Sequence, residues 1–172
     1  AVTNMYIDHQ NWHKDMEDYI GAKKNIFKYQ DKEGILVVNI DNDITKNFPS
    51  EAHGKCLTTS LINKNADYYL DNTDLTIYEN QEPLLNTKGL VLDGEHNLYN
   101  ILMATAITIT QNIDPSIIKK IVTQFKGVAG REELVKEIKG VKYFNDTTAT
   151  SVEAMKAMFE RFESNYRGKI VM

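Results

Sequence analysis

Residues 94–107 of the chain read Gly94-Glu95-His96-Asn97-Leu98-Tyr99-Asn100-Ile101-Leu102-Met103-Ala104-Thr105-Ala106-Ile107. In and just beyond this stretch, residues suited to a core recur at steps of three and four, at Leu98, Ile101, Leu102, Thr105 and Ile109. This period is typical of a helix that packs one face on a core. The stretch therefore predicts a buried helix over residues 94–111.

The first turn of this helix carries two amide side chains, Asn97 and Asn100, three residues apart and therefore on one face. A helix start also offers backbone N–H groups without intrahelical partners, and the helix dipole favours anions there. Because an amide both donates and accepts hydrogen bonds, such a pair can bind a flat heterocycle such as adenine. The spacing equally allows both asparagines merely to satisfy the helix end.

The bulk composition is that of an ordinary globular protein, with 42% hydrophobic and 26% charged residues. The formal net charge of −4 comes without a long run of either sign, which argues against nucleic acid as the main partner. The single cysteine, Cys56, cannot form an internal disulfide and favours a reducing, cytoplasmic location. No apolar run approaches the roughly 20 residues that span a bilayer, so no membrane partner is expected.

Upstream of residue 94, the pattern predicts an α/β fold. Strands are expected at residues 2–6 and 34–40, the second being a continuous apolar run typical of a parallel sheet. An amphipathic helix is expected between them, over residues 15–30. Short β-rich pieces within residues 54–92 predict a β-meander, with strands at 56–58, 67–70, 75–78 and 90–92 and turns at 72–74 and 80–83.

Downstream, Asp114 and Pro115 are typical of the cap and first residue of another helix, and Gly127 is typical of its end. Its expected core face consists of Ile117, Ile118, Ile121, Val122 and Phe125. The pattern then changes to a strand pair, 133–138 and 141–144, and a helix over 152–162. We therefore predict a domain boundary after residue 127, which gives domains 1–127 and 128–172.

A polar turn, residues 145–151, joins the last strand to the last helix, and such a turn before a helix start can bind an anion. Asp146 or Thr150 can instead simply cap that helix. In the linker, Arg131 can stack on adenine or pair with phosphate, although an ordinary surface arginine is the alternative.

Lys23 falls on the expected apolar face of the helix over residues 15–30. A lysine there usually extends its amine to water. A buried lysine, however, has a lowered pKa, and a neutral amine can take up carbon dioxide as a carbamate whose carboxylate suits Mg²⁺. His9 and His13 are spaced like a pair of metal ligands, but no third ligand is near them in sequence, so zinc is not indicated.

Four segments resemble signature motifs of the Mur ligases, the ATP-dependent amino-acid ligases of peptidoglycan precursor synthesis. Residues 94–100 resemble the His-Asn-x-x-Asn motif, which implies that Asn97 and Asn100 lie beside the adenine of ATP. The Asp8-His9 pair and Lys23 resemble a second motif, with Gln10-Asn11-Trp12 where Leu-Asp-Arg is usual. It implies that His9 and carbamylated Lys23 are catalytic residues that hold Mg²⁺.

The other two motifs lie downstream. Residues 127–135 resemble the family's domain junction, with Gly130 where histidine is usual, and imply that Arg131 binds the nucleotide. Residues 143–151 resemble the D-glutamate-adding branch, which implies that Asp146 meets the ribose and Thr150 lies near D-glutamate. Thr148 stands where lysine is commoner, so it takes that substrate-side position without the charge.

The resemblance implies part of a parallel-sheet ATPase domain followed by the start of a Rossmann-like C-terminal domain. It also implies a cytoplasmic, ATP- and Mg²⁺-dependent ligase that joins D-glutamate to UDP-N-acetylmuramoyl-L-alanine through an acyl phosphate. Because the sequence contains no Gly-x-x-x-x-Gly-Lys-Ser/Thr phosphate loop, we expect an internal segment of such a ligase, inactive alone. The alternatives are another Mur-type or folylpolyglutamate-type ligase, or a non-catalytic nucleotide-binding module.

Overall fold

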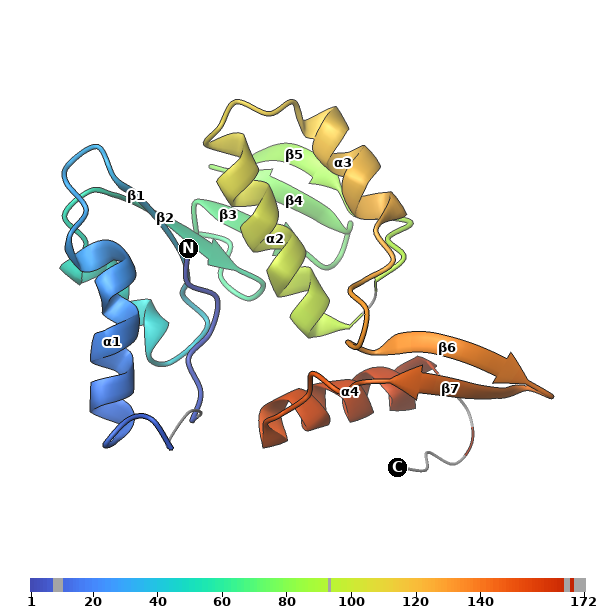
Figure 1. Ribbon diagram of the computed structural model, residues 1–172. Helices are drawn as coiled ribbons and strands as arrows, with labels where there is room; N and C mark the ends of the chain where they lie inside the picture. The colour runs from blue at the N-terminus through green and yellow to red at the C-terminus, as the bar shows by residue number, and fades with distance from the viewer. Residues whose placement is uncertain (8–10, 93, 166–167, 169–172) are drawn as a thin grey trace.

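The computed structural model describes residues 1–7, 11–92, 94–165 and 168. Its elements are, in chain order, α1 (Met16–Lys28), β1 (Ile35–Asn39), the 3₁₀ helix η1 (Thr45–Glu51), β2 (Lys55–Ser60), β3 (Tyr68–Asp71), β4 (Thr76–Glu79), β5 (Glu82–Asn86), α2 (Glu95–Ile109), α3 (Pro115–Gln124), β6 (Glu133–Ile138), β7 (Val141–Asn145) and α4 (Val152–Asn165). The expected α/β class is confirmed (Figure 1). No helix in the described ranges is long and apolar enough to cross a membrane.

The first five strands form one sheet in the order β1-β2-β3-β4-β5. The pairs β1–β2 and β2–β3 are parallel, whereas β3–β4 and β4–β5 are antiparallel. A parallel strand at residues 34–40 is thus confirmed, and the meander consists of β3 to β5. Because β2 runs parallel to β3, it belongs to the parallel part of the sheet rather than to the meander.

Three details of the strand prediction are wrong. Residues 2–6 form no strand, because only Val2 makes a parallel bridge, to Val38. Residues 90–92 are not a strand, and the fifth strand comes earlier, where Pro83 had indicated a turn. Pro83 is tolerated because β5 is the edge strand, where a missing N–H group costs little.

Helices α1 and α3 begin at the expected residues, each capped by an aspartate. The Asp15 carboxylate accepts a hydrogen bond from the Asp18 N–H (2.9 Å) at the start of α1, and Asp114 accepts one from the Ser116 N–H (2.7 Å) at the start of α3. The expected cap of the last helix is wrong, because the Ser151 hydroxyl, not Asp146 or Thr150, accepts a hydrogen bond from the Ala154 N–H (3.1 Å) in the first turn of α4. The predicted end of α3 at Gly127 is wrong. Phe125 already adopts an extended conformation, so the helix ends at Gln124.

The sheet is covered on both faces at β1, and alternate residues of this strand enter two cores. Val37 belongs to the core under α2 and α3, whereas Leu36 and Val38 belong to the core under α1. On α3 the buried face is narrower than predicted. Ile118 is buried, but Ile117, Ile121 and Phe125 are each about half exposed.

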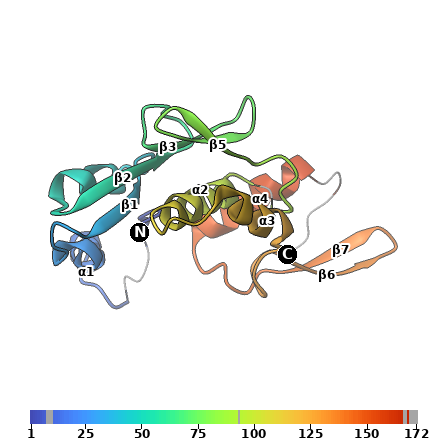
Figure 2. The same ribbon diagram turned by 90° about the horizontal axis from the view of Figure 1, so that it is seen from above.

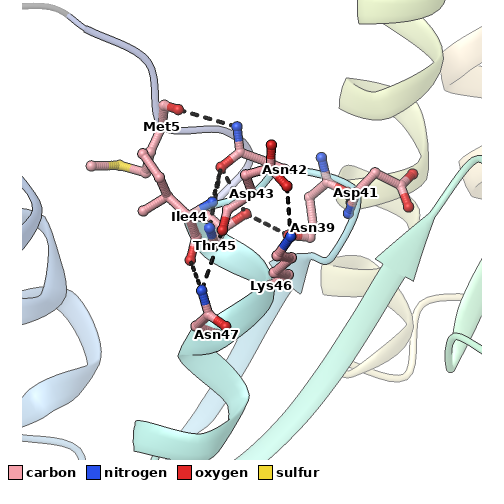
Figure 3. A network of polar contacts seen from close by, with 9 residues as sticks. All are labelled: Met5, Asn39, Asp41, Asn42, Asp43, Ile44, Thr45, Lys46 and Asn47. Carbon is pink, nitrogen blue, oxygen red and sulfur yellow. Dashed lines mark hydrogen bonds and ion pairs between the residues drawn. The ribbon is translucent and has the colours of Figure 1, made fainter.

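The turn after β1 is fixed by side-chain hydrogen bonds (Figure 3). The side-chain oxygen of Asn42, Oδ1, accepts from the N–H groups of Ile44 and Thr45, both at 3.1 Å. Its side-chain nitrogen, Nδ2, donates to the Met5 backbone carbonyl at 3.1 Å. Asp41 lies in this turn, and its carboxylate accepts hydrogen bonds from the Leu61 N–H (2.7 Å) and from the Tyr99 hydroxyl on α2 (3.0 Å). These contacts join the end of β1 to α2.

The rest of the chain forms a small β-hairpin and a helix. Strands β6 and β7 pair antiparallel over the predicted residues, and the Phe144 ring packs on the Phe162 ring of α4 at 4.5 Å between centroids. Helix α4 also contacts α2. In Figure 1 the first turn of α2 points toward α4, and in Figure 2 the two helices overlap, so the start of α2 lies where the two parts of the chain meet.

Candidate functional site

Two hollows meet at the first turns of α2. The first, of about 760 Å³, lies between residues 3–6, the start of α2, the 146–151 turn and α4. The second, of about 850 Å³, lies between α2, α3, residues 127–134 and Phe144. Both are lined by the same five side chains, which form their common wall: His96, Asn100, Arg131, Glu132 and Arg161.

The first hollow is polar, and we call it the polar hollow. Hydroxyl, amide and carboxylate groups line it, among them those of Thr3, Asn4, Tyr99, Asp146, Thr148 and Thr150. It therefore holds all three residues that the sequence analysis singled out in the 145–151 turn. Such a lining suits a ligand with many hydrogen-bonding groups.

The second hollow, which we call the apolar hollow, has mostly aliphatic and aromatic walls. These come from Val91, Leu92, Ile101, Ile121, Phe125 and Phe144. At its edge toward the common wall lie Asn97, which is 9% exposed, and Asn100, which is exposed. An apolar pocket with a few convergent polar groups is the usual form of a small-molecule site and fits a flat heterocycle.

The structure brings together the four residues predicted to bind nucleotide. Asn97, Asn100 and Arg131 line the apolar hollow, whereas Asn100, Arg131 and Asp146 line the polar hollow. They come from α2, from the linker and from the end of β7. Their roles as nucleotide ligands remain predictions, but their gathering is what a nucleotide bound across the two parts of the chain requires.

Lys23 lies on α1 and lines neither hollow. Its predicted position on the apolar face is wrong, because Tyr19 and Phe27 are buried while Lys23 is exposed, with its amine 5.4 Å from the Tyr19 ring centroid. A period of three and four also fits the neighbouring edge of an amphipathic helix, where a lysine reaches water.

His9, the predicted partner of Lys23, lies outside the described residues. Among the residues that are described, no group of three His, Cys, Asp or Glu side chains could hold a metal ion. His13 instead pairs with Asp18, with 3.0 Å between Nδ1 and Oδ2, and this hydrogen bond holds the pKa of the Asp18 carboxyl below its usual range.

The common wall contains a cluster of charged side chains that no sequence motif indicated. The Glu132 carboxylate lies 3.3 Å from His96 Nε2 through one oxygen and pairs with the Arg161 guanidinium through the other. His96 stood in the quoted stretch and Glu132 follows Arg131. However, nothing local in the sequence links Glu132 to Arg161, which is 29 residues away.

Tyr99 is a second residue that sequence alone did not indicate. Its hydroxyl donates to the Asp41 carboxylate (3.0 Å), and burial together with the nearby Asp41 charge raises the pKa of Tyr99 well above its usual range. Tyr99 therefore remains a neutral phenol in the wall of the polar hollow, where it ties α2 to the end of β1.

Gly130 has a backbone reason to be glycine. Its φ of +76° lies in the left-handed region, where a side chain is strained, and an added Cβ would come 3.2 Å from Thr147 Oγ1. A histidine at this position would adopt a strained backbone conformation and would have to displace the Thr147 hydroxyl slightly.

Comparison with known proteins adds sequence evidence. The sequence profile of the Mur ligase middle domain matches residues 1–108. A curated relative from Acetivibrio thermocellus, named UDP-N-acetylmuramoylalanine–D-glutamate ligase, is 42% identical over 154 residues, which cover 88% of this chain and 33% of the relative. A relative of the same name from Clostridium tetani is 41% identical over 166 residues, covering 94% and 35%. The chain thus spans about a third of the length of these curated relatives.

A solved structure is also similar. The MurF ligase of Thermotoga maritima in complex with ADP superposes with a TM-score of 0.73 at 20% identity, over 98% of this chain and 40% of that protein. At this identity the likeness concerns the fold alone.

Proposed function

This chain belongs to the Mur ligase family, and from that premise we propose that it is a segment of an ATP-dependent ligase that adds D-glutamate to UDP-N-acetylmuramoyl-L-alanine. The names of the relatives at 41–42% identity support this amino acid. Structural likeness extends to other Mur-type and folate-type ligases, but at 16–20% identity it supports only the shared fold. We place such a ligase in the cytoplasm, in keeping with the single cysteine.

The observation that carries the proposal is the gathering of Asn97, Asn100, Arg131 and Asp146 around two joined hollows. The adenine would enter the apolar hollow, where the two amides can read its edge. The ribose would lie near Asp146 in the polar hollow. Arg131, in the common wall, can stack on the base or pair with a phosphate.

In the proposed reaction, the carboxylate of the muramoyl substrate attacks the γ-phosphate of ATP, which breaks the bond to the β-phosphate oxygen, releases ADP and gives an acyl phosphate. The D-glutamate amine then attacks the acyl carbon and forms the amide, with release of phosphate and a proton. Such catalysis rests on positioning and on stabilising the developing charge. This chain would contribute nucleotide binding and, through Thr148 and Thr150, the polar wall on the substrate side.

A magnesium ion would offset the phosphate charge in this reaction. From the family resemblance alone, we propose His9 and carbamylated Lys23 as its ligands.

We further propose that residues 1–127 are the later part of a central ATP-binding domain and that residues 128–172 begin a C-terminal domain. Two features support this division. Helix α3 ends at Gln124, where Phe125 adopts an extended conformation. Among the described strands, β6 and β7 pair only with each other.

Phosphate release tests the proposal in the full-length protein that carries this chain, with UDP-N-acetylmuramoyl-L-alanine, ATP and Mg²⁺. Release should require D-glutamate, and L-glutamate and diaminopimelate are the matched controls. Equal release with either control would contradict the proposed amino acid. The 172-residue chain alone should give background release, because its sequence lacks a phosphate loop. Turnover by that chain would contradict the proposal that it is only a segment.

A further inference from the structure

We propose that Glu132 is a positioning residue for the nucleotide site. It fixes the linker that precedes β6 against α2 and α4, and thereby orients the Asp146 carboxylate and Arg131. The inference rests on the proposed nucleotide binding. It concerns a residue that touches neither the base nor the ribose in that proposal.

The Glu132 side chain joins three segments of the chain. One carboxylate oxygen lies 3.3 Å from Nε2 of His96, in the first turn of α2, and the other pairs with the guanidinium of Arg161 on α4. The Glu132 side chain is only 9% exposed and that of Arg161 only 11%. A carboxylate removed from water in this way depends strongly on its partners, so the cluster favours one arrangement of α2, linker and α4.

The backbone of Glu132 carries this constraint to Asp146. Its φ of +46° lies in the left-handed region, which a non-glycine residue keeps only where its surroundings hold it. In this conformation the Glu132 N–H donates to Asp146 Oδ1 at 3.0 Å. The anchored side chain therefore supports a strained peptide that in turn orients the carboxylate proposed to meet the ribose.

The same short segment also holds the neighbouring residues. The Gly130 N–H donates to a Glu133 carboxylate oxygen at 2.8 Å, and the Gly130 carbonyl accepts from the Thr148 N–H at 3.1 Å. Arg131 lies between these anchored positions, so its direction into the common wall depends on the conformation of the linker.

The charges explain how a carboxylate can stand beside a site for an anion. Glu132 lines both hollows, and an unpaired carboxylate there would repel the phosphates of ATP. The Arg161 guanidinium offsets that charge at contact distance. Removing either partner should therefore disturb nucleotide binding through the same unit.

The test uses the full-length protein with Glu132→Gln, Arg161→Met and the double variant, and Glu137→Gln as the matched control. Glu137 is an exposed glutamate on the same strand, β6. Calorimetry gives the dissociation constant of ATP, steady-state kinetics the KM for D-glutamate, and thermal unfolding the Tm.

Each single variant should weaken ATP binding about tenfold, and the double variant no more than either, because coupled residues are not additive. The KM for D-glutamate should change much less than the dissociation constant of ATP, and the control should behave like the wild type. If the ion pair were purely structural, its loss would lower the Tm and would change the dissociation constant of ATP and the KM for D-glutamate to a similar degree. If Arg161→Met fails to fold, Arg161→Lys keeps the cation without the planar fork and should show the same separation to a smaller degree.

Unchanged ATP affinity in a folded Glu132→Gln variant would overturn the inference. So would an additive loss in the double variant, or a parallel loss of ATP and D-glutamate affinity. A wild-type protein that binds no ATP would overturn the proposed function, and this is seen before any variant is compared.

Discussion

Asn100 is the residue at which the nucleotide proposal can be tested with least risk to the fold. Its side chain is exposed and lines both hollows. Asn100→Ala would leave an edge of adenine unpaired, at a cost of roughly 1–3 kcal/mol, or about ten- to a hundredfold in ATP affinity. Calorimetry on the full-length protein should show this loss with an unchanged Tm. Gln111→Ala, which removes an exposed amide just beyond the end of α2, is the control and should bind ATP normally.

Sequence was informative about single residues where a motif and its structural context agree. The asparagines of α2 share a face because of their spacing, and Asp146 directly follows strand β7, in the polar turn that precedes α4. Lys23 was misplaced because periodicity does not fix the edge of an apolar stripe. The contact between Glu132 and Arg161 was out of reach, since it depends on how α4 packs against the linker.

Among the elements, α2 contains a polar group that its packing does not use. Thr105 is fully buried, and its hydroxyl has no hydrogen-bond partner within the described chain. Thr105→Val replaces the hydroxyl by a methyl group of similar size and removes a desolvated polar atom, which costs about 1–3 kcal/mol when unpaired. We expect the variant to be as stable as the wild type or more so.

Chemical unfolding of the full-length protein should then show an equal or higher midpoint for Thr105→Val. Thr108→Val is the contrast, because the Thr108 hydroxyl donates to the Ala104 carbonyl at 2.9 Å and its loss should not stabilise. A clear drop in the midpoint for Thr105→Val would mean that its hydroxyl has a partner after all, such as a buried water.

The elements were predictable where local chemistry is unambiguous. The apolar run of β1, the cap of α3 and the boundaries of the β6–β7 pair needed no tertiary information. Strand β5 was missed because a proline such as Pro83 normally indicates a turn. It is compatible with a strand at the edge of a sheet, and the edge position cannot be known from the sequence. The short helix η1 also lacked a periodic signal.

At the scale of the whole molecule, the sequence indicated two parts and a boundary but not how the parts meet. Their contact depends on side chains far apart in the chain, which pack the start of α2 against the linker and α4. Both hollows are lined by residues from both parts of the chain. A nucleotide that fills both would therefore bind to, and stabilise, the arrangement of the two parts.

Hydrogen exchange on the full-length protein can measure that coupling. At an ATP concentration of 100 times its dissociation constant, the bound arrangement gains about 2.7 kcal/mol, so exchange that requires its opening should slow about a hundredfold. The effect should appear in the first turn of α2 and also at the amides of Glu132 and Thr148, which donate hydrogen bonds to the Asp146 carboxylate and the Gly130 carbonyl.

The exposed hairpin tip at Lys139-Gly140 is the internal control and should exchange at the same rate with and without ATP. Slowing confined to α2 would mean that the nucleotide binds one part only, and Arg131 and Asp146 would then lose their assigned roles.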